Sequence, residues 1–176
     1  MYSYAYPHPA VTTDIVIFSI RDEALKVLLI KRAGKPYKGK WALPGGFVRE
    51  DEDLDTSALR ELEEETGVRD VYLEQLYTFG EPQRDPRERV ITVAYYALIA
   101  SDQVSLCAAT DAEAVGWFGL DETPLLAFDH AGIIAMANER LIAKRDYTTK
   151  AFHFLPENFS LTKMQADYEV ILGDEI

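Results

Sequence analysis

Four glutamates stand within five positions of the chain: Glu61, Glu63, Glu64 and Glu65. Carboxylates are hard oxygen donors of the kind that Mg²⁺ and Mn²⁺ prefer in proteins. Positions 61, 64 and 65 are spaced i, i+3 and i+4, so on a helix all three side chains can point to one side. This spacing suits a divalent-cation site. The alternative is the solvated face of an acidic protein, and for the glutamate cluster taken alone that alternative is favoured, because charge patterning is weak evidence.

A helix over residues 54–66 would position these carboxylates. Its apolar residues recur at helical spacing: Leu54, Ala58, Leu59 and Leu62. Asp53 is a candidate N-cap, and Gly67 can take the left-handed conformation that ends a helix. The acids then lie at the C-terminal end, where the helix dipole makes each of them cost about 0.3–1 kcal/mol. A bound cation would reverse that cost, so the placement favours a metal site.

The segment WALPGGFV, residues 41–48, reads as a strand broken by a proline and two glycines. Glycines let the backbone approach a ligand closely and free a carbonyl from strand geometry. A carbonyl at Gly45 would be a further hard oxygen donor. Arg60 lies beside the glutamates and can hold part of the cluster by bidentate pairing. We therefore expect the Gly–Gly loop and the helix to form one site.

These residues together resemble the signature of the Nudix hydrolases, G-x5-E-x7-R-E-U-x-E-E-x-G-U, in which U is a bulky apolar residue. Every fixed position is filled in this chain: Gly46, Glu52, Arg60, Glu61, Leu62, Glu64, Glu65, Gly67 and Val68. Nine specified positions at fixed spacing are far more specific than a short glycine motif. The resemblance implies the α/β fold class, as a Nudix α/β/α sandwich with a mixed sheet.

The resemblance also implies a chemistry, the hydrolysis of a nucleoside diphosphate linked to another group with Mg²⁺ or Mn²⁺ as cofactor. The metal ligands it implies are Gly45, Glu61, Glu64 and Glu65. Glu64 or a loop acid would take a proton from the attacking water, while Glu52 and Arg60 would orient the metal ligands. Many Nudix enzymes use a further acid before a late strand, and here Asp111 or Glu113 stands at that place. Plain solvent exposure is the alternative for both.

The loop EPQRDPRER, residues 81–89, groups three arginines: Arg84, Arg87 and Arg89. Ion pairing or solubility would account for them equally well. However, RDPRERVITVAYYALI resembles a segment of the ADP-ribose pyrophosphatase-like branch and its regulatory relatives, which implies that these arginines bind the pyrophosphate or the terminal ribose. Arginine suits bidentate phosphate contact. Arg32, at the end of a strand near the Gly–Gly loop in the expected fold, is a further substrate-binding candidate.

ADP-ribose is therefore the expected substrate, with AMP and ribose 5-phosphate as products. Two alternatives stay open. Nudix-related transcriptional regulators of NAD metabolism bind ADP-ribose-like ligands and need not hydrolyse them, and other Nudix hydrolases remove oxidised nucleoside triphosphates. The intact signature favours catalysis, because a pure sensor has no use for a repulsive glutamate cluster.

Patterning and turn residues indicate the remaining elements. Strands are predicted over residues 14–20, 25–32, 71–80, 90–100 and 114–120, and a second helix over 128–145, with His130 at its start in a structural role. We assign residues 1–146 to the Nudix domain and 147–176 to a tail. The tail contains a predicted amphipathic helix over 160–172 and resembles the start of the winged helix found in the regulators. Its apolar stripe must be covered by its own domain or by a second subunit, and a homodimer is expected because related Nudix proteins pair.

Composition excludes several classes of protein. The chain of 176 residues is 48% hydrophobic, which suits one domain with a full core. Since the sequence contains no apolar run near 18 residues and no secretory signal pattern, we expect no membrane association. A single cysteine, Cys107, cannot form an internal disulfide, which fits a reduced cytoplasmic protein. The net charge of −12 would repel a phosphate ligand unless metal ions and local arginines intervene.

We predict that this chain alone does not bind DNA. Residues 147–176 contain two lysines against five acids, and non-specific DNA affinity comes from Lys and Arg that neutralise phosphates. A winged helix would also need a recognition helix for the major groove, and no such helix is expected in this sequence. A gel-shift assay at low salt with the chain's own upstream DNA is the test. Clear, salt-sensitive binding would contradict the prediction and would favour the regulator.

Overall fold

The computed structural model describes residues 4–99, 112–143 and Val170 of the 176-residue chain. Four sequence-based expectations fall outside the described residues. They concern Cys107, Asp111, the boundary after residue 146 and the tail with its helix over 160–172. The described part contains the whole segment from the first strand to the second helix, apart from residues 100–111.

The sheet is built around a long hairpin. β1 (Ala10–Arg21) and β2 (Ala24–Arg32) pair antiparallel, and Arg21 lies opposite Ala24. The two residues between them, Asp22 and Glu23, both have positive φ angles, of 52° and 59°. Turns with two positive φ angles match the right-handed twist of paired strands. The strands predicted over 14–20 and 25–32 are confirmed, and both are longer than predicted.

In the described part of the chain, five further strands complete a mixed sheet. They are β3 (Trp41–Ala42), β4 (Gly45–Phe47), β5 (Glu74–Phe79), β6 (Val90–Ile99) and β7 (Ala112–Gly119). The order is β3-β2-β1-β6-β5, with β4 also paired to β1 and β7 to β2. β1 and β6 run parallel, whereas the other strand pairs are antiparallel. β1 therefore lies at the centre of the sheet.

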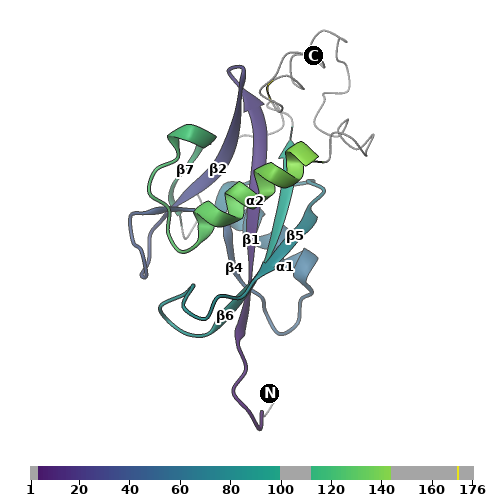
Figure 1. Ribbon diagram of the computed structural model, residues 1–176. Helices are drawn as coiled ribbons and strands as arrows, with labels where there is room; N and C mark the ends of the chain where they lie inside the picture. Colours follow the sequence, from purple (N-terminus) through teal and green to yellow (C-terminus); the bar gives the residue numbers. More distant parts are fainter. Residues whose placement is uncertain (1–3, 100–111, 144–169, 171–176) are drawn as a thin grey trace.

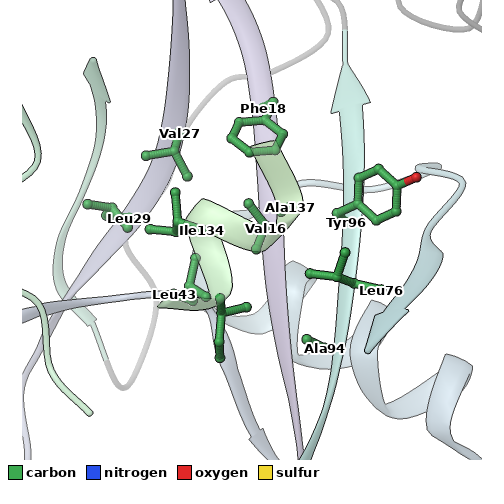
Figure 2. Close-up of a cluster of buried hydrophobic side chains, with 11 residues drawn as sticks. Val16, Phe18, Val27, Leu29, Leu43, Leu76, Ala94, Tyr96, Ile134 and Ala137 are labelled. Atoms are coloured by element: carbon green, nitrogen blue, oxygen red, sulfur yellow. The ribbon is translucent and has the colours of Figure 1, made fainter. Parts of the chain in front are cut away.

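Two helices cover opposite faces of this sheet (Figure 1). Val16 and Phe18 of β1 belong to the core cluster that includes Ile134 of α2 (His130–Ala143), and Figure 2 labels all three. The alternate residues Ile15 and Ile17 belong to the cluster that packs against α1 (Leu54–Thr66). Because successive side chains of a strand point to opposite faces, this alternation places one helix on each side. The predicted α/β/α sandwich is confirmed.

α1 begins and ends where the sequence predicts. Asp53 is the N-cap, and its side chain accepts a hydrogen bond from the Thr56 amide at 2.8 Å. Gly67 adopts the left-handed conformation with φ 77°, and its amide donates to the Glu63 carbonyl at 2.9 Å. The buried apolar residues are Ala58 and Leu62. Leu59, which shares the predicted apolar set, is 41% exposed.

Two elements are shorter than predicted. The strand expected over 71–80 begins at Glu74, since Val71 and Leu73 pack against the core around α1 before the chain pairs with β6. The second helix begins at His130 instead of residue 128, because Phe128 has a φ of 53°, which lies outside the right-handed helical region. Among the described residues, no helix is long and apolar enough to cross a membrane.

Candidate active site

A cavity of about 670 Å³ opens where the Gly–Gly loop, the inner side of α1 and two later loops meet. β1 contributes Thr12 and Asp14 to its wall, and α1 contributes Glu61 and Glu65. The rest of the wall includes the end of β2 and the loop after it, the loop after β5 and the start of α2, with the lining residues Arg32, Gly34, Arg84, Asp85, Arg87, Phe128 and His130. The cavity therefore collects charged side chains that are far apart in the sequence.

The two glycines allow a close approach between the loop and α1. A Cβ atom on Gly46 would lie 2.5 Å from Oε1 of Glu61. A Cβ atom on Gly45, whose φ is 153°, would lie 2.2 Å from the Thr13 carbonyl oxygen. Both distances are shorter than the contacts that Cβ atoms make in proteins, so a side chain at either position would force the loop or the glutamate to move. The Gly–Gly loop and α1 thus pack closely enough to form one site, as the sequence predicts.

The glutamates of the cluster differ in their surroundings. Glu65 is buried, and its Oε2 accepts a hydrogen bond from the Gly45 amide at 2.8 Å. Glu61 is largely buried, and its Oε1 accepts from Nη1 of Arg60 at 2.6 Å. Burial raises the pKa of the Glu61 carboxyl, although the neighbouring Arg60 opposes this shift. Glu64 is more exposed and does not line the cavity.

Arg60 connects the carboxylates of this region. Its Nε and Nη2 donate to the two carboxylate oxygens of Glu52 at 2.8 and 2.6 Å, which is a bidentate pair. Its Nη1 donates to Glu61 and, at 3.1 Å, to Glu64. The hydrogen bond from Arg60 lowers the pKa of the Glu52 carboxyl to about 2. This arrangement suits the orienting role proposed for both residues.

Arginines offset the repulsion expected at the C-terminal end of α1. Glu63 pairs with Arg69 at 2.7 Å, and Glu64 lies 3.4 Å from Arg49 in addition to its contact with Arg60. Arg49 precedes the helix and Arg69 comes after it, so helical i, i+4 spacing predicts neither contact. The cost of the glutamate cluster without a metal is therefore smaller than helix rules alone predict.

The donor set suits a hard cation, but it is not assembled around one point. In the described part of the chain, no three Asp, Glu, His or Cys side chains converge closely enough to hold an ion. The Glu65 carboxylate contacts the Gly45 amide, whereas Glu61 and Glu64 contact Arg60. Arg60 contacts only Oε1 of Glu61 and Oε2 of Glu64, so an ion bound by all three glutamates would use the other oxygen of each of these two carboxylates.

Three of the predicted substrate-binding arginines line the cavity: Arg32, Arg84 and Arg87. Arg84 is buried, and its guanidinium contacts Asp14 at 3.2 Å and Asp129 at 2.7 Å. Arg87 pairs with Asp85 at 2.7 Å, and its guanidinium carbon lies 5.0 Å from the ring centre of Phe47. Arg84 is therefore committed to two carboxylates, while Arg87 is more accessible.

Arg32 shares an aromatic neighbour with Arg87. The guanidinium carbons of Arg32 and Arg87 lie 5.0 and 5.9 Å from the ring centre of Phe128. Burial lowers the pKa of Arg32, and the positive charge of Arg87 adds to this effect. Two like charges held near one ring would be stabilised by an anion between them, as expected of residues that bind phosphate.

Five predicted site residues do not line the cavity. Glu52, Arg60 and Glu64 are connected to the lining residue Glu61 through Arg60, whereas Arg89 and Glu113 are not. Arg89 does not line the cavity, and its Nη1 donates to the Gly80 carbonyl at 2.8 Å, which closes the base of the loop. Glu113 on β7 also lies outside the lining and pairs with Lys31 at 3.6 Å. The structure thus gives both residues local partners away from Glu61 and Glu65.

Several residues of the cavity region are not predicted from the sequence: Asp14, Arg49, Asp85, Phe47, Phe128 and the charged neighbour of Arg84, Asp129. Asp14 could have been found, since it is the one charged residue in the otherwise apolar stretch DIVIFSI. A buried strand with a carboxylate needs a partner for that charge. Phe47 ends the three-residue strand β4, and the others lie in loops, where no periodicity signals the direction of a side chain.

Comparison with known proteins identifies the family. The NUDIX domain model matches residues 9–137. The chain belongs to the NUDIX domain family. A Nudix relative, the ADPR-responsive transcriptional repressor NtrR of Acinetobacter baylyi, is 40% identical over 97% of this chain and 70% of its own length. An ADP-ribose pyrophosphatase of Methanocaldococcus jannaschii is 40% identical over 73% of each chain.

A solved structure agrees with these relatives. The NUDIX domain of Shewanella oneidensis NrtR, in complex with ADP ribose, is 41% identical, with a TM-score of 0.72 over 78% of this chain and 91% of that domain. The family inferred from the Nudix signature is thus supported by the family model, by the fold and by these relatives. The role of each individual residue still rests on the geometry described above.

We predict that the Glu52–Arg60 pair stabilises the native chain fully above the ordinary Glu52 pKa of 4.5 and progressively less as the pH falls towards 2. The pKa of Glu52 falls from its ordinary value of 4.5 to about 2 in the folded state. A depressed carboxyl pKa contributes stability that is fully present above the unfolded pKa and is lost as pH falls through the folded one. The Glu52→Gln variant should therefore unfold more readily than the wild type at pH 7, and the difference should shrink as pH falls from 4.5 towards 2. Urea unfolding at several pH values measures it. A difference that is unchanged at pH 2.5 would contradict the assignment.

Proposed function

We propose that this Nudix chain hydrolyses ADP-ribose to AMP and ribose 5-phosphate with Mg²⁺ or Mn²⁺ as cofactor. The observation that carries the proposal is the meeting of Glu61 and Glu65 from the complete signature with Arg32 and Arg87 in one cavity. The first pair suits a divalent cation and the second suits phosphate oxygens. The similarity to an ADP-ribose pyrophosphatase supports this choice of substrate.

Charge balance in the cavity explains why a metal is needed. The lining carries four carboxylates and four guanidinium groups: Asp14, Glu61, Glu65, Asp85, Arg32, Arg49, Arg84 and Arg87. Burial lowers the pKa of His130, so its ring adds no charge at neutral pH. The cavity is therefore close to neutral within a chain of net charge −12. A diphosphate enters such a site favourably only when divalent cations supply additional positive charge.

The residues divide the chemistry among them. Glu61, Glu64, Glu65 and the Gly45 carbonyl would hold the metal, which would lower the pKa of a bound water and polarise the pyrophosphate. Glu52 and Arg60 hold the ligand carboxylates in orientation. We assign the proton from the attacking water to Glu64, which is accessible to solvent. We prefer it to Glu113, because Glu64 shares Arg60 with the cavity residue Glu61, whereas Glu113 pairs with Lys31.

A second candidate function is an ADP-ribose-responsive domain of a transcriptional regulator. The similarity to the Acinetobacter repressor extends over 97% of this chain, whereas the similarity to the pyrophosphatase covers 73%. The same cavity would then bind ADP-ribose without the need for turnover. In either role we propose a cytoplasmic homodimer. No observation favours a nucleoside triphosphate as substrate.

A substrate panel separates these functions. The chain with Mg²⁺ would be incubated with ADP-ribose, other nucleoside diphosphate compounds and nucleoside triphosphates, and the products separated by chromatography. Release of AMP from ADP-ribose at an enzymatic rate supports the proposal. Tight binding of ADP-ribose without turnover would favour the regulator, and faster consumption of a triphosphate would refute the choice of substrate.

We predict that Glu61 couples metal binding to stability. Millimolar Mg²⁺ should raise the melting temperature of the wild type, since a ligand that binds only the native state stabilises it. Glu61→Gln should leave the metal-free melting temperature unchanged or slightly higher, because the charge of a largely buried carboxylate is removed. It should abolish most of the rise with Mg²⁺. Differential scanning fluorimetry measures both quantities.

The matched control for this prediction is Glu63→Gln. Glu63 lies on the same helix but pairs with Arg69 and does not line the cavity. Its Mg²⁺ response should remain that of the wild type. An equal loss of response in both variants would show that general acidity, and not a specific site, binds the cation.

We predict that Arg87 contributes ground-state binding of the ligand. Arg87→Ala should raise KM for ADP-ribose by about tenfold or more and lower kcat less, because uniform binding affects KM without affecting turnover. Arg89→Ala should raise KM less, since Arg89 bonds the Gly80 carbonyl outside the cavity. Steady-state kinetics at saturating Mg²⁺ measure both. Equal effects of the two substitutions would favour the sequence-based grouping of these arginines over the structural one.

A further inference from the structure

His130 lies at the start of α2 and is 3% exposed. Its Nδ1 accepts a hydrogen bond from the Leu43 amide at 2.8 Å, across 87 positions of the chain. Its Nε2 lies 3.5 Å from Oδ1 of Asp14 on β1. The imidazole therefore joins the second helix both to the central strand and to the segment that enters the Gly–Gly loop.

These contacts determine the tautomer of the ring. A nitrogen that accepts a hydrogen bond carries no proton, so the proton of the neutral imidazole is on Nε2, on the side of Asp14. Burial lowers the pKa of His130 and favours this neutral form. A neutral ring with one acceptor and one donor matches the Leu43 amide on one side and the Asp14 carboxylate on the other.

The Leu43 amide begins the turn that carries the Gly–Gly loop. The next residue, Pro44, accepts a hydrogen bond at its carbonyl from the Ile15 amide at 2.9 Å. Gly45 comes next, pairs in register with Asp14, and donates its amide to Glu65 at 2.8 Å. The turn is thus fixed at three successive residues, and the first of these contacts comes from His130.

The contacts also set the position of the Glu65 carboxylate. A shift of Leu43 would move Gly45, and the hydrogen-bonded Glu65 would move with it or lose its partner. The next residue, Pro44, has no N–H group, so it cannot donate a hydrogen bond that would hold the turn in place of the Leu43 amide. The Leu43 amide is buried against α2, so without the imidazole it would have no acceptor and the local backbone would have to rearrange.

We infer that His130 is a positioning residue for the metal site. Its Nδ1 accepts a hydrogen bond from the Leu43 amide and so fixes the turn that holds Glu65. This inference rests on the metal site of the proposed function. His130 lies in contact with the Leu43 backbone and not with the proposed ligands, so its effect reaches the metal through Gly45.

Two substitutions separate the two contacts of the ring. In His130→Asn the amide oxygen occupies nearly the place of Nδ1 and can still accept from Leu43, while the contact with Asp14 is lost. In His130→Gln the amide group reaches the place of Nε2 near Asp14, while the acceptor for Leu43 is lost. Both variants remove ring packing against Phe128, whose ring centre lies 5.2 Å from that of His130. They therefore share any general loss of stability.

The measurement is Mn²⁺ affinity of the full chain, monitored by electron paramagnetic resonance of the free ion, which needs no turnover. Outer residues that orient metal ligands typically change metal affinity by about 10–100-fold when substituted. His130→Gln should weaken Mn²⁺ binding by about tenfold or more, and His130→Asn should bind within about threefold of the wild type. Glu139→Gln, at an exposed position of the same helix, is the matched control and should bind like the wild type.

The outcomes distinguish this inference from the proposed function. If His130→Asn weakens Mn²⁺ binding as much as His130→Gln, or more, the assignment to the Leu43 contact is wrong. Equal affinities in the wild type and both variants would overturn it as well. A wild-type chain that binds no Mn²⁺ refutes the proposed metal site itself. A wild type that binds Mn²⁺ but does not hydrolyse ADP-ribose refutes only the proposed reaction. Thermal unfolding of each variant, recorded without metal, confirms that the compared chains are folded.

Discussion

The candidate site depends on the absence of side chains at two adjacent backbone positions. Gly46 lets the Glu61 carboxylate lie against the loop, and Gly45 lets the loop lie against β1. At this short range the Gly45 amide can hold Glu65 by a hydrogen bond, so the loop fixes one carboxylate of the signature directly. An alanine at either position would bring a Cβ to within 2.5 Å of another atom. The other features of the site serve to bring this loop and this helix together and to keep them there.

The central strand β1 connects this constraint to the rest of the fold. Its alternate residues pack against α1 on one face of the sheet and α2 on the other. At its N-terminal half the same alternation replaces apolar residues by Thr12 and Asp14, which line the cavity. Asp14 contacts Arg84 from the loop after β5 and approaches His130 from α2. One strand thus lies between the glutamates and the arginines of the cavity, and the buried charge of Asp14 is stabilised by Arg84 and by the ring of His130.

The sequence predicts the local parts of this arrangement well. The start and end of α1 are encoded by Asp53 and Gly67, whose capping contacts involve residues no more than four positions away. The signature spacing predicts that Glu61 and Glu65 share a site with the Gly–Gly loop. The sequence cannot predict which partners the charges find across the fold. Arg84 pairs with Asp14, which is 70 positions away, and so it is less accessible to a ligand than Arg87 three residues later. The departure of Arg89 and Glu113 from the cavity has the same cause, because each takes a partner that only the folded chain supplies.

Arg60 links the stability of the ligand-free chain to its chemistry. Its guanidinium contacts Glu52, Glu61 and Glu64 at once. Without a metal, its positive charge therefore offsets part of the negative charge of these carboxylates. Its bidentate bond to Glu52 keeps it there, and the hydrogen bond raises the pKa of Arg60 further. A metal that bound Glu61 and Glu64 would therefore share these carboxylates with a guanidinium that cannot lose its proton. Because Arg60 contacts only one oxygen of each carboxylate and is held by Glu52, it would orient both carboxylates and leave their other oxygens for a metal. The two proposed functions would both use this arrangement, and they would differ in whether bound ADP-ribose is hydrolysed.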